Sequence, residues 1–157
     1  MDDPPDWLPE IFEFDGDWNA FVDAVYAKFC DDVVRSIVLF QGSRVSVRRV
    51  PETDGKGFGF WHCVSEGHDE TSRTPDLSRC ERICWIRAVI ENHPDPRIDH
   101  WTNQRGRDTH HLLWLDEEYL VVLAQRNGYF LLKTAYLTQR GHTVRRLRKE
   151  RDSSKNG

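Results

Sequence analysis

The chain has 157 residues, of which 38% are hydrophobic and 31% are charged, and its formal net charge is −4. This length and composition are typical of one globular domain with one core. No apolar run approaches the roughly 20 residues that span a bilayer, and the acidic N-terminus lacks the pattern of a secretory signal, so we expect a cytoplasmic protein without membrane contact.

The charges are distributed unevenly along the chain. Residues 1–34 contain ten acidic side chains and a single base, Lys28, whereas residues 137–157 contain seven bases. The two ends can attract each other, or the basic end can bind a polyanion, although a solvated basic helix is an equal alternative. We therefore divide one domain, 1–157, into an extended acidic N-terminus (1–16), a helix and hairpin (17–50), an α+β core (58–141) and a basic tail (142–157).

The first half of the chain begins with a helical pattern and then changes to a strand pattern. Apolar residues recur at helical spacing over 17–34, and Asp17 is a suitable N-cap. Residues 36–50 predict a hairpin with its turn at Gln41-Gly42-Ser43. The run "FGFWHCV" (58–64) predicts a strand that ends near His62.

The second half predicts one more helix followed by a meander of strands. The helix begins near Thr74-Pro75-Asp76, where Thr74 can cap, and ends at "ENHPDP", because proline cannot continue a helix. Segments 111–115, 118–124 and 129–137 predict strands, 98–101 predicts a short strand or a loop, and 142–152 a helix. The fold class is therefore α+β, with N-terminal helices packed on a twisted antiparallel sheet of about four strands and a basic C-terminal helix.

The last predicted strand, "YFLLKTAYL", ends in polar side chains. Strand alternation predicts Thr134 and Tyr136 on one face and Lys133 on the other. Two hydroxyls about 7 Å apart suit two oxygens of one phosphodiester. Tyr136 can equally be a core aromatic with a hydrated hydroxyl, and Lys133 can simply extend into solvent.

Several arginines and one tryptophan are candidates for binding RNA. In "WTNQRGRDTHH", Arg105 and Arg107 can clamp phosphate and Trp101 can stack on a base, although a solvated loop would look the same. Arg79 and Arg82 share one helix surface, where nearby carboxylates are alternative partners. The tail adds Arg145, Arg146 and Arg148.

The histidines and cysteines give weaker signals. His62 can act as a general acid or base near neutral pH, although a hydrogen-bonded structural histidine is an alternative. The loop-like contexts of His68, His93, His100, His110 and His111 select none of them. A zinc site built from His62, Cys63 and His68 is an alternative, but the spacings lack paired CxxC motifs. We predict no metal and no other cofactor.

The segment from "FWHCVSEG" through "LLWLDEEYLVVL" to "GYFLLKTAYL" is similar to a known group of ribonucleases. Residues 58–150 resemble the phage- and plasmid-borne barnase–EndoU–colicin E5/D–RelE-like ribonuclease toxin group. The resemblance implies a helical part on a four-stranded antiparallel sheet, metal-independent RNA cleavage, and a neutralising antitoxin or immunity protein. His62 matches the strand-borne histidine, Thr134 and Tyr136 match the hydroxyl-bearing last strand, and Arg79 or Arg82 matches a basic helix residue.

The sequence therefore predicts a metal-independent endoribonuclease that cleaves RNA by attack of the 2′-OH. Alternatives are a non-catalytic RNA- or protein-binding module and a neutralising partner in a two-component system. The predicted catalytic residues are His62, Thr134, Tyr136 and Arg82, and the predicted RNA-binding residues are Arg79, Trp101, Arg105, Arg107, Lys133, Arg145, Arg146 and Arg148.

Overall fold

The computed structural model of the protein describes residues 3–66 and 74–155. The helices are α1 (Trp18–Phe29), the π-helical turn η1 (Cys30–Val34), α2 (Phe58–Val64), α3 (Leu77–Glu81), α4 (Ile83–Asn92) and α5 (Gly141–Lys155). The long strands are β7 (Ile98–Arg105), β8 (Asp108–Leu115), β9 (Tyr119–Gln125) and β10 (Phe130–Leu137). The short strands are β1 (Leu39–Phe40), β2 (Ser43–Ser46), β3 (Glu52–Thr53), β4 (Lys56–Gly57), β5 (Ser65–Glu66) and β6 (Thr74–Pro75).

The main sheet has six strands in the order β1-β2-β10-β9-β8-β7. Strands β7 to β10 form an antiparallel meander, whereas β10 pairs in parallel with β2, Phe130 opposite Val45. The predicted α+β class is confirmed, but the sheet is mixed and larger than the predicted four antiparallel strands. The parallel pairing joins segments far apart in the chain, which alternation within one segment does not reveal.

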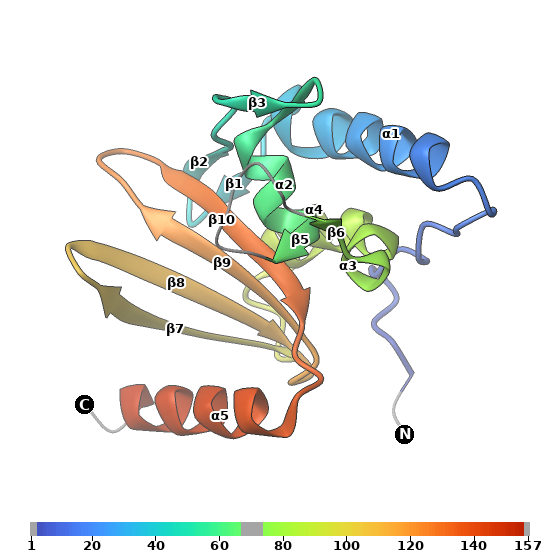
Figure 1. Ribbon diagram of the computed structural model, residues 1–157. Coiled ribbons are helices and arrows are strands. Elements are labelled where there is room, and N and C mark those ends of the chain that lie inside the picture. The colour runs from blue at the N-terminus through green and yellow to red at the C-terminus, as the bar shows by residue number, and fades with distance from the viewer. Residues whose placement is uncertain (1–2, 67–73, 156–157) are drawn as a thin grey trace.

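Both faces of the sheet are covered, as Figure 1 shows, with the N-terminal helices on one side and α5 on the other. On the first face, Leu113, Val121 and Leu123 belong to the main core together with residues of α1 and α4. On the second face, Trp114 and Leu120 form a smaller cluster with α5. Strands buried on both faces read as continuous apolar runs, which explains "HLLWL" and "EYLVVLA".

Two local predictions in the first half are confirmed. The Asp17 carboxylate accepts a hydrogen bond from the Ala20 amide at 3.1 Å and caps α1. The hairpin β1–β2 turns at Gln41 and Gly42, both with positive φ, as a two-residue hairpin turn requires.

The prediction of a strand over 58–64 is wrong, because this segment forms helix α2. A short apolar run cannot be assigned to strand or helix by periodicity alone. Gly59 allows the helix to lie against the preceding loop: its amide donates to the Arg48 carbonyl at 2.7 Å, and an added Cβ would overlap Val47. His62 is therefore held on a helix rather than at a strand end.

The second half differs from the prediction in two further places. The predicted helix near 74–92 is divided at Arg82 into α3 and α4, and Asp76 caps α3 by accepting from the Ser78 amide at 2.9 Å. Strand β7 extends through residues 98–105, so the polar segment after Trp101 is a β-hairpin that turns at Gly106 rather than a loop.

Cys80 and Cys84 are one helical turn apart in the sequence, and both pack in or against the main core.

Candidate functional site

A β-bulge in β10 brings three polar side chains to one face of the sheet. The register between β10 and β9 shifts between Leu132 and Thr134, at Lys133. Leu132 and Ala135 therefore both face the main core, while Lys133, Thr134 and Tyr136 line one cavity on the opposite face. The sequence predicts that Lys133 faces away from the two hydroxyls, and this is wrong. The bulge adds one residue to β10, so the side chains after Lys133 lie on the opposite faces from those that strict alternation predicts.

This cavity, which we call the cationic cavity, has a volume of about 270 Å³. Three bases line it, Arg105 at the end of β7, Lys133 in β10 and Arg146 in α5. The described residues of its lining include neither Asp nor Glu. Converging positive charge with no lining carboxylate favours an anionic ligand.

Three rings also line the cationic cavity: His62 from α2, His110 from β8 and Tyr136 from β10. Its apolar floor comes from β8 and β9 of the sheet. The cavity thus combines two imidazoles, a phenol and three cations. Five of these six side chains, all but His110, were predicted from the sequence as catalytic or RNA-binding.

The position of His62 depends on Thr134. The Thr134 hydroxyl donates to the backbone carbonyl of His62 at 2.7 Å, joining α2 to β10. The His62 ring stacks on Phe58, with centroids 4.1 Å apart. Because the hydroxyl hydrogen is already used, the prediction that Thr134 donates to phosphate is corrected: Thr134 positions His62.

His110 is the residue that the sequence did not single out. Burial lowers the pKa of its imidazole, and the charges of Lys133, Arg105 and Arg126 lower it further against the opposing effect of Asp108. A lowered pKa keeps the ring neutral at neutral pH, so that it can accept a proton. The sequence contains one clue to this position. His110 and His111 are neighbours in a strand, so their side chains must face opposite sides of the sheet.

Helix α5 covers part of the second sheet face and brings Arg146 to the cavity. Leu147 is buried in the smaller cluster, and the Glu150 carboxylate accepts hydrogen bonds from Trp101 Nε1 and Asn103 Nδ2, both at 2.8 Å. The predicted base stacking by Trp101 is wrong, because the residue is only 4% exposed and its N–H is already used.

Ion pairs connect helix α5 to the β8–β9 turn and to β7. Arg148 makes two hydrogen bonds to Glu117, at 2.9 and 3.0 Å, and these are the main cause of the lowered pKa of Glu117. Arg151 contacts Asp99 at 2.7 Å and Glu117 at 2.9 Å. The predicted RNA contact of Arg148 is corrected, since its guanidinium binds a carboxylate of the protein.

Two predicted arginines also lie outside the cationic cavity. Arg79 is 7% exposed and donates to the Ser65 carbonyl at 3.1 Å and to Glu66 at 3.0 Å, so its predicted RNA contact is corrected to a structural role. Arg82 donates to the Ser78 carbonyl at 3.1 Å and packs over Trp85, so it is not placed for the predicted catalytic role.

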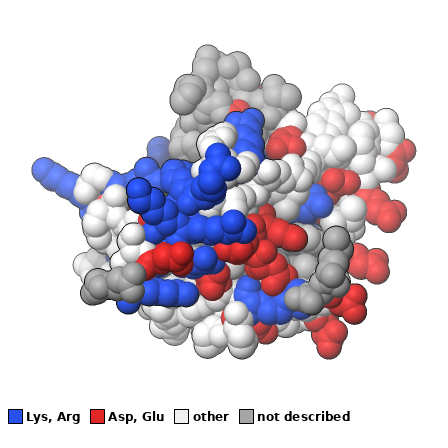
Figure 2. Space-filling view, turned by 90° about the horizontal axis from the view of Figure 1, so that it is seen from below, with Lys and Arg blue, Asp and Glu red and all other residues white. Residues whose placement is uncertain are grey.

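The remaining predicted bases, Arg107 and Arg145, are exposed in the β7–β8 turn and on α5. Figure 2, seen from the side of α5, shows Lys and Arg side chains gathered over one part of this face and Asp and Glu side chains over another. The exposed cations can extend an anion-binding surface beyond the cavity.

Three other histidines cluster on the opposite sheet face, at the end of the main core. His100 Nε2 lies 2.9 Å from His111 Nδ1, and His111 Nε2 lies 2.9 Å from Gln125 Oε1. The ring centroids of His93 and His100 are 4.8 Å apart, and Phe40 packs against all three imidazoles. We call His93, His100 and His111 the histidine plug; His100 and His111 are hydrogen-bonded to each other, His93 packs against His100, and none of the three lines the cationic cavity.

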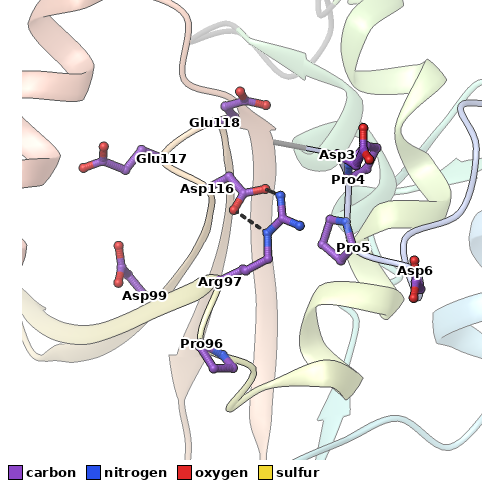
Figure 3. A pocket seen from close by; sticks show the side chains of 10 residues that line it. All are labelled: Asp3, Pro4, Pro5, Asp6, Pro96, Arg97, Asp99, Asp116, Glu117 and Glu118. Carbon is purple, nitrogen blue, oxygen red and sulfur yellow. Dashed lines mark hydrogen bonds and ion pairs between the residues drawn. The ribbon is translucent and has the colours of Figure 1, made fainter. Parts of the chain in front are cut away.

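Another hollow, with a volume of about 930 Å³, has the opposite charge. Figure 3 shows carboxylates from the N-terminal segment, β7 and the β8–β9 turn around it, and Arg97 bound to Asp116 through two hydrogen bonds of 2.9 and 2.7 Å. None of the predicted site residues lines this hollow. Its carboxylates repel phosphate, so it is unsuited to RNA.

Within residues 3–66 and 74–155, no group of three or more His, Cys, Asp or Glu side chains could hold a metal ion. His68, one member of the alternative zinc site, lies outside the described residues. None of the described helices is both long and apolar enough to cross a bilayer. Comparisons of the chain with protein-family models, curated proteins and solved structures found no match.

Proposed function

We propose that the protein is a metal-independent endoribonuclease whose active site is the cationic cavity. The observation that supports this proposal most is the convergence of His62, His110 and Tyr136 with three cations in one cavity whose described lining lacks carboxylates. The ribonuclease resemblance of residues 58–150 points to the same chemistry.

The cations would bind the scissile phosphodiester and stabilise its transition state. A phosphodiester has one negative charge, and attack by the 2′ oxygen adds a second on the phosphorane oxygens. Lys133, Arg105 and Arg146 can interact more strongly with the doubly charged species, which lowers the barrier. No metal is needed for this stabilisation, because the side chains supply the positive charge.

The two imidazoles would transfer the protons. Neutral His110 removes the proton from the 2′-OH, the 2′ oxygen bonds to phosphorus, and the bond to the 5′ oxygen breaks. Protonated His62 gives its proton to the departing 5′ oxygen, leaving a 2′,3′-cyclic phosphate. The Tyr136 hydroxyl orients a phosphate oxygen. Each proton-transfer group is expected to contribute about 10² to 10⁴ in rate.

Incubation of the purified protein with total RNA in excess EDTA tests the proposal. We expect shortened RNA with 2′,3′-cyclic phosphate ends, and at least a roughly hundredfold lower rate for His62→Gln and for His110→Gln. His142→Gln, a change at an exposed histidine at the start of α5, is the matched control and should cleave normally. Folded His62 and His110 variants that cut at the original rate would remove both rings from the mechanism.

A non-catalytic RNA-binding module is the second candidate, and the exposed bases Arg145 and Lys149 on α5 favour it. Such a module would shift RNA in a gel without shortening it, and its affinity would fall steeply with salt.

We also propose that the ribonuclease acts in the cytoplasm as a toxin of a phage or plasmid system and is neutralised by an antitoxin or immunity protein. Expression alone should then arrest growth in a manner that depends on His110. Normal growth with active protein would contradict the toxin role.

A further inference from the structure

Tyr136 lines a second hollow in addition to the cationic cavity. This second hollow, which we call the polar hollow, has a volume of about 170 Å³ and is formed by the β5 and α3 region on one side and residues 137–143 on the other. Because Tyr136 belongs to both linings, the two hollows are neighbours along β10.

The polar hollow differs from the cationic cavity in charge. Its carboxylates, Glu66 and Asp76, lie 3.0 and 3.7 Å from the guanidinium of Arg79, which also stacks over the Tyr136 ring at 5.0 Å. Arg79 therefore balances only one of the two carboxylate charges, and its guanidinium holds the phenol in place. A second phosphate would meet these carboxylates, so the hollow does not suit an anion.

Among the described residues that line the polar hollow, the Ser78 and Thr138 hydroxyls are already hydrogen-bonded, which leaves Gln139, Arg140 and Thr143 to meet a ligand. Gln139 and Arg140 are exposed, and Thr143 is half-buried. An amide offers both donors and an acceptor, a guanidinium offers donors, and a hydroxyl offers both. This combination, beside an aromatic ring, suits the hydrogen-bonding edge of a planar heterocycle.

We propose that the polar hollow receives a base of the RNA whose phosphate occupies the cationic cavity. The inference rests on the proposed function, because the neighbouring phosphate fixes which ligand reaches the hollow. Gln139 is the specificity-determining residue, since its amide can read a base edge. Arg79 is a positioning residue that acts through Tyr136. A base read on its edge cannot be paired, so the substrate is single-stranded RNA.

The test uses affinities of 2′-deoxy dinucleotides, which the 2′-OH mechanism cannot cleave, with each of the four bases at either position. We expect the protein to prefer one base at one position roughly tenfold, as a hydrogen-bonded base edge allows. Gln139→Ala should remove the preference and leave the affinity for the poorest dinucleotide unchanged. Gln104→Ala, at an exposed glutamine of β7 outside both hollows, should keep it.

The outcomes separate this inference from the proposed function. Dinucleotides that bind equally well whatever their bases, or a preference that survives Gln139→Ala, overturn the base site even if RNA is cleaved. A preference abolished by Gln139→Ala supports the base site even if RNA stays intact, and the loss of catalysis then counts against the ribonuclease alone. Failure of every dinucleotide to bind overturns the base site together with the phosphate site.

Discussion

Acidification should destabilise this protein through His100, a member of the histidine plug. Burial, with smaller contributions from the charges of His93 and His111, lowers the pKa of His100 from 6.5 to about 4 in the folded protein. The unfolded chain therefore binds this proton more tightly than the folded protein does. The stabilising contribution is complete above about pH 6.5 and is lost as the pH falls toward 4.

The size of the effect follows from proton linkage. Each tenfold difference in proton affinity corresponds to about 1.4 kcal/mol. Between pH 7 and pH 5, the folded ring stays mostly neutral while the unfolded ring becomes protonated, so His100 alone should remove about 2 kcal/mol from the free energy of unfolding. This is a large part of the roughly 5–15 kcal/mol by which typical domains are stable.

Urea denaturation at pH 7 and pH 5, compared between the wild type and His100→Gln, measures this contribution. The glutamine amide can still bond to His111 but takes up no proton. We expect the pH-dependent loss to be about 2 kcal/mol smaller in the variant, while His142→Gln behaves like the wild type. An equal loss in the wild type and in His100→Gln would refute the assigned role of this ring.

Three further changes test the packing and the electrostatics. Gly59→Ala should lower the free energy of unfolding by about 1–3 kcal/mol in urea, because steric overlap with the preceding loop outweighs the better helix propensity of alanine; equal or greater stability would contradict this packing. Glu150→Ala should lower the free energy of unfolding by about 1–3 kcal/mol, and with it the melting temperature, because the Trp101 N–H loses its acceptor. An unchanged melting temperature would contradict this contribution. Lys133→Met should raise the pKa of His110 in an NMR titration, since the ammonium charge lowers it; an unchanged or lower pKa would show that this charge does not act on the ring.

Part of the fold was readable from the sequence because its signals are local. Asp17 marked the start of α1 by its capping chemistry, and the long apolar runs marked β8 and β9. Helix α2 is not readable in this way, because its seven mostly apolar residues fit a strand as well as a helix. The parallel contact of β2 with β10 depends on tertiary packing and leaves no local signal.

The candidate site was partly predictable for a similar reason. The polar end of the last strand drew attention to Lys133 and Tyr136, and the cavity contains both. The bulge that turns Lys133 toward Tyr136 inserts one residue into the pairing and cannot be read from alternation. The burial of Trp101 is not readable from the sequence, because its polar neighbours give no sign that α5 covers its ring.

The central claim is that the cationic cavity binds a phosphodiester of RNA between His62 and His110. The most direct measurement is an NMR titration of the histidine ring protons with a 2′-deoxy dinucleotide. We predict that the signals of His62 and His110 shift as dinucleotide is added, until the binding site is saturated. The signals of His93, His100 and His111, on the other face of the sheet, should stay in place. Unmoved His62 and His110 signals, or shifts confined to the three plug histidines, would contradict the account.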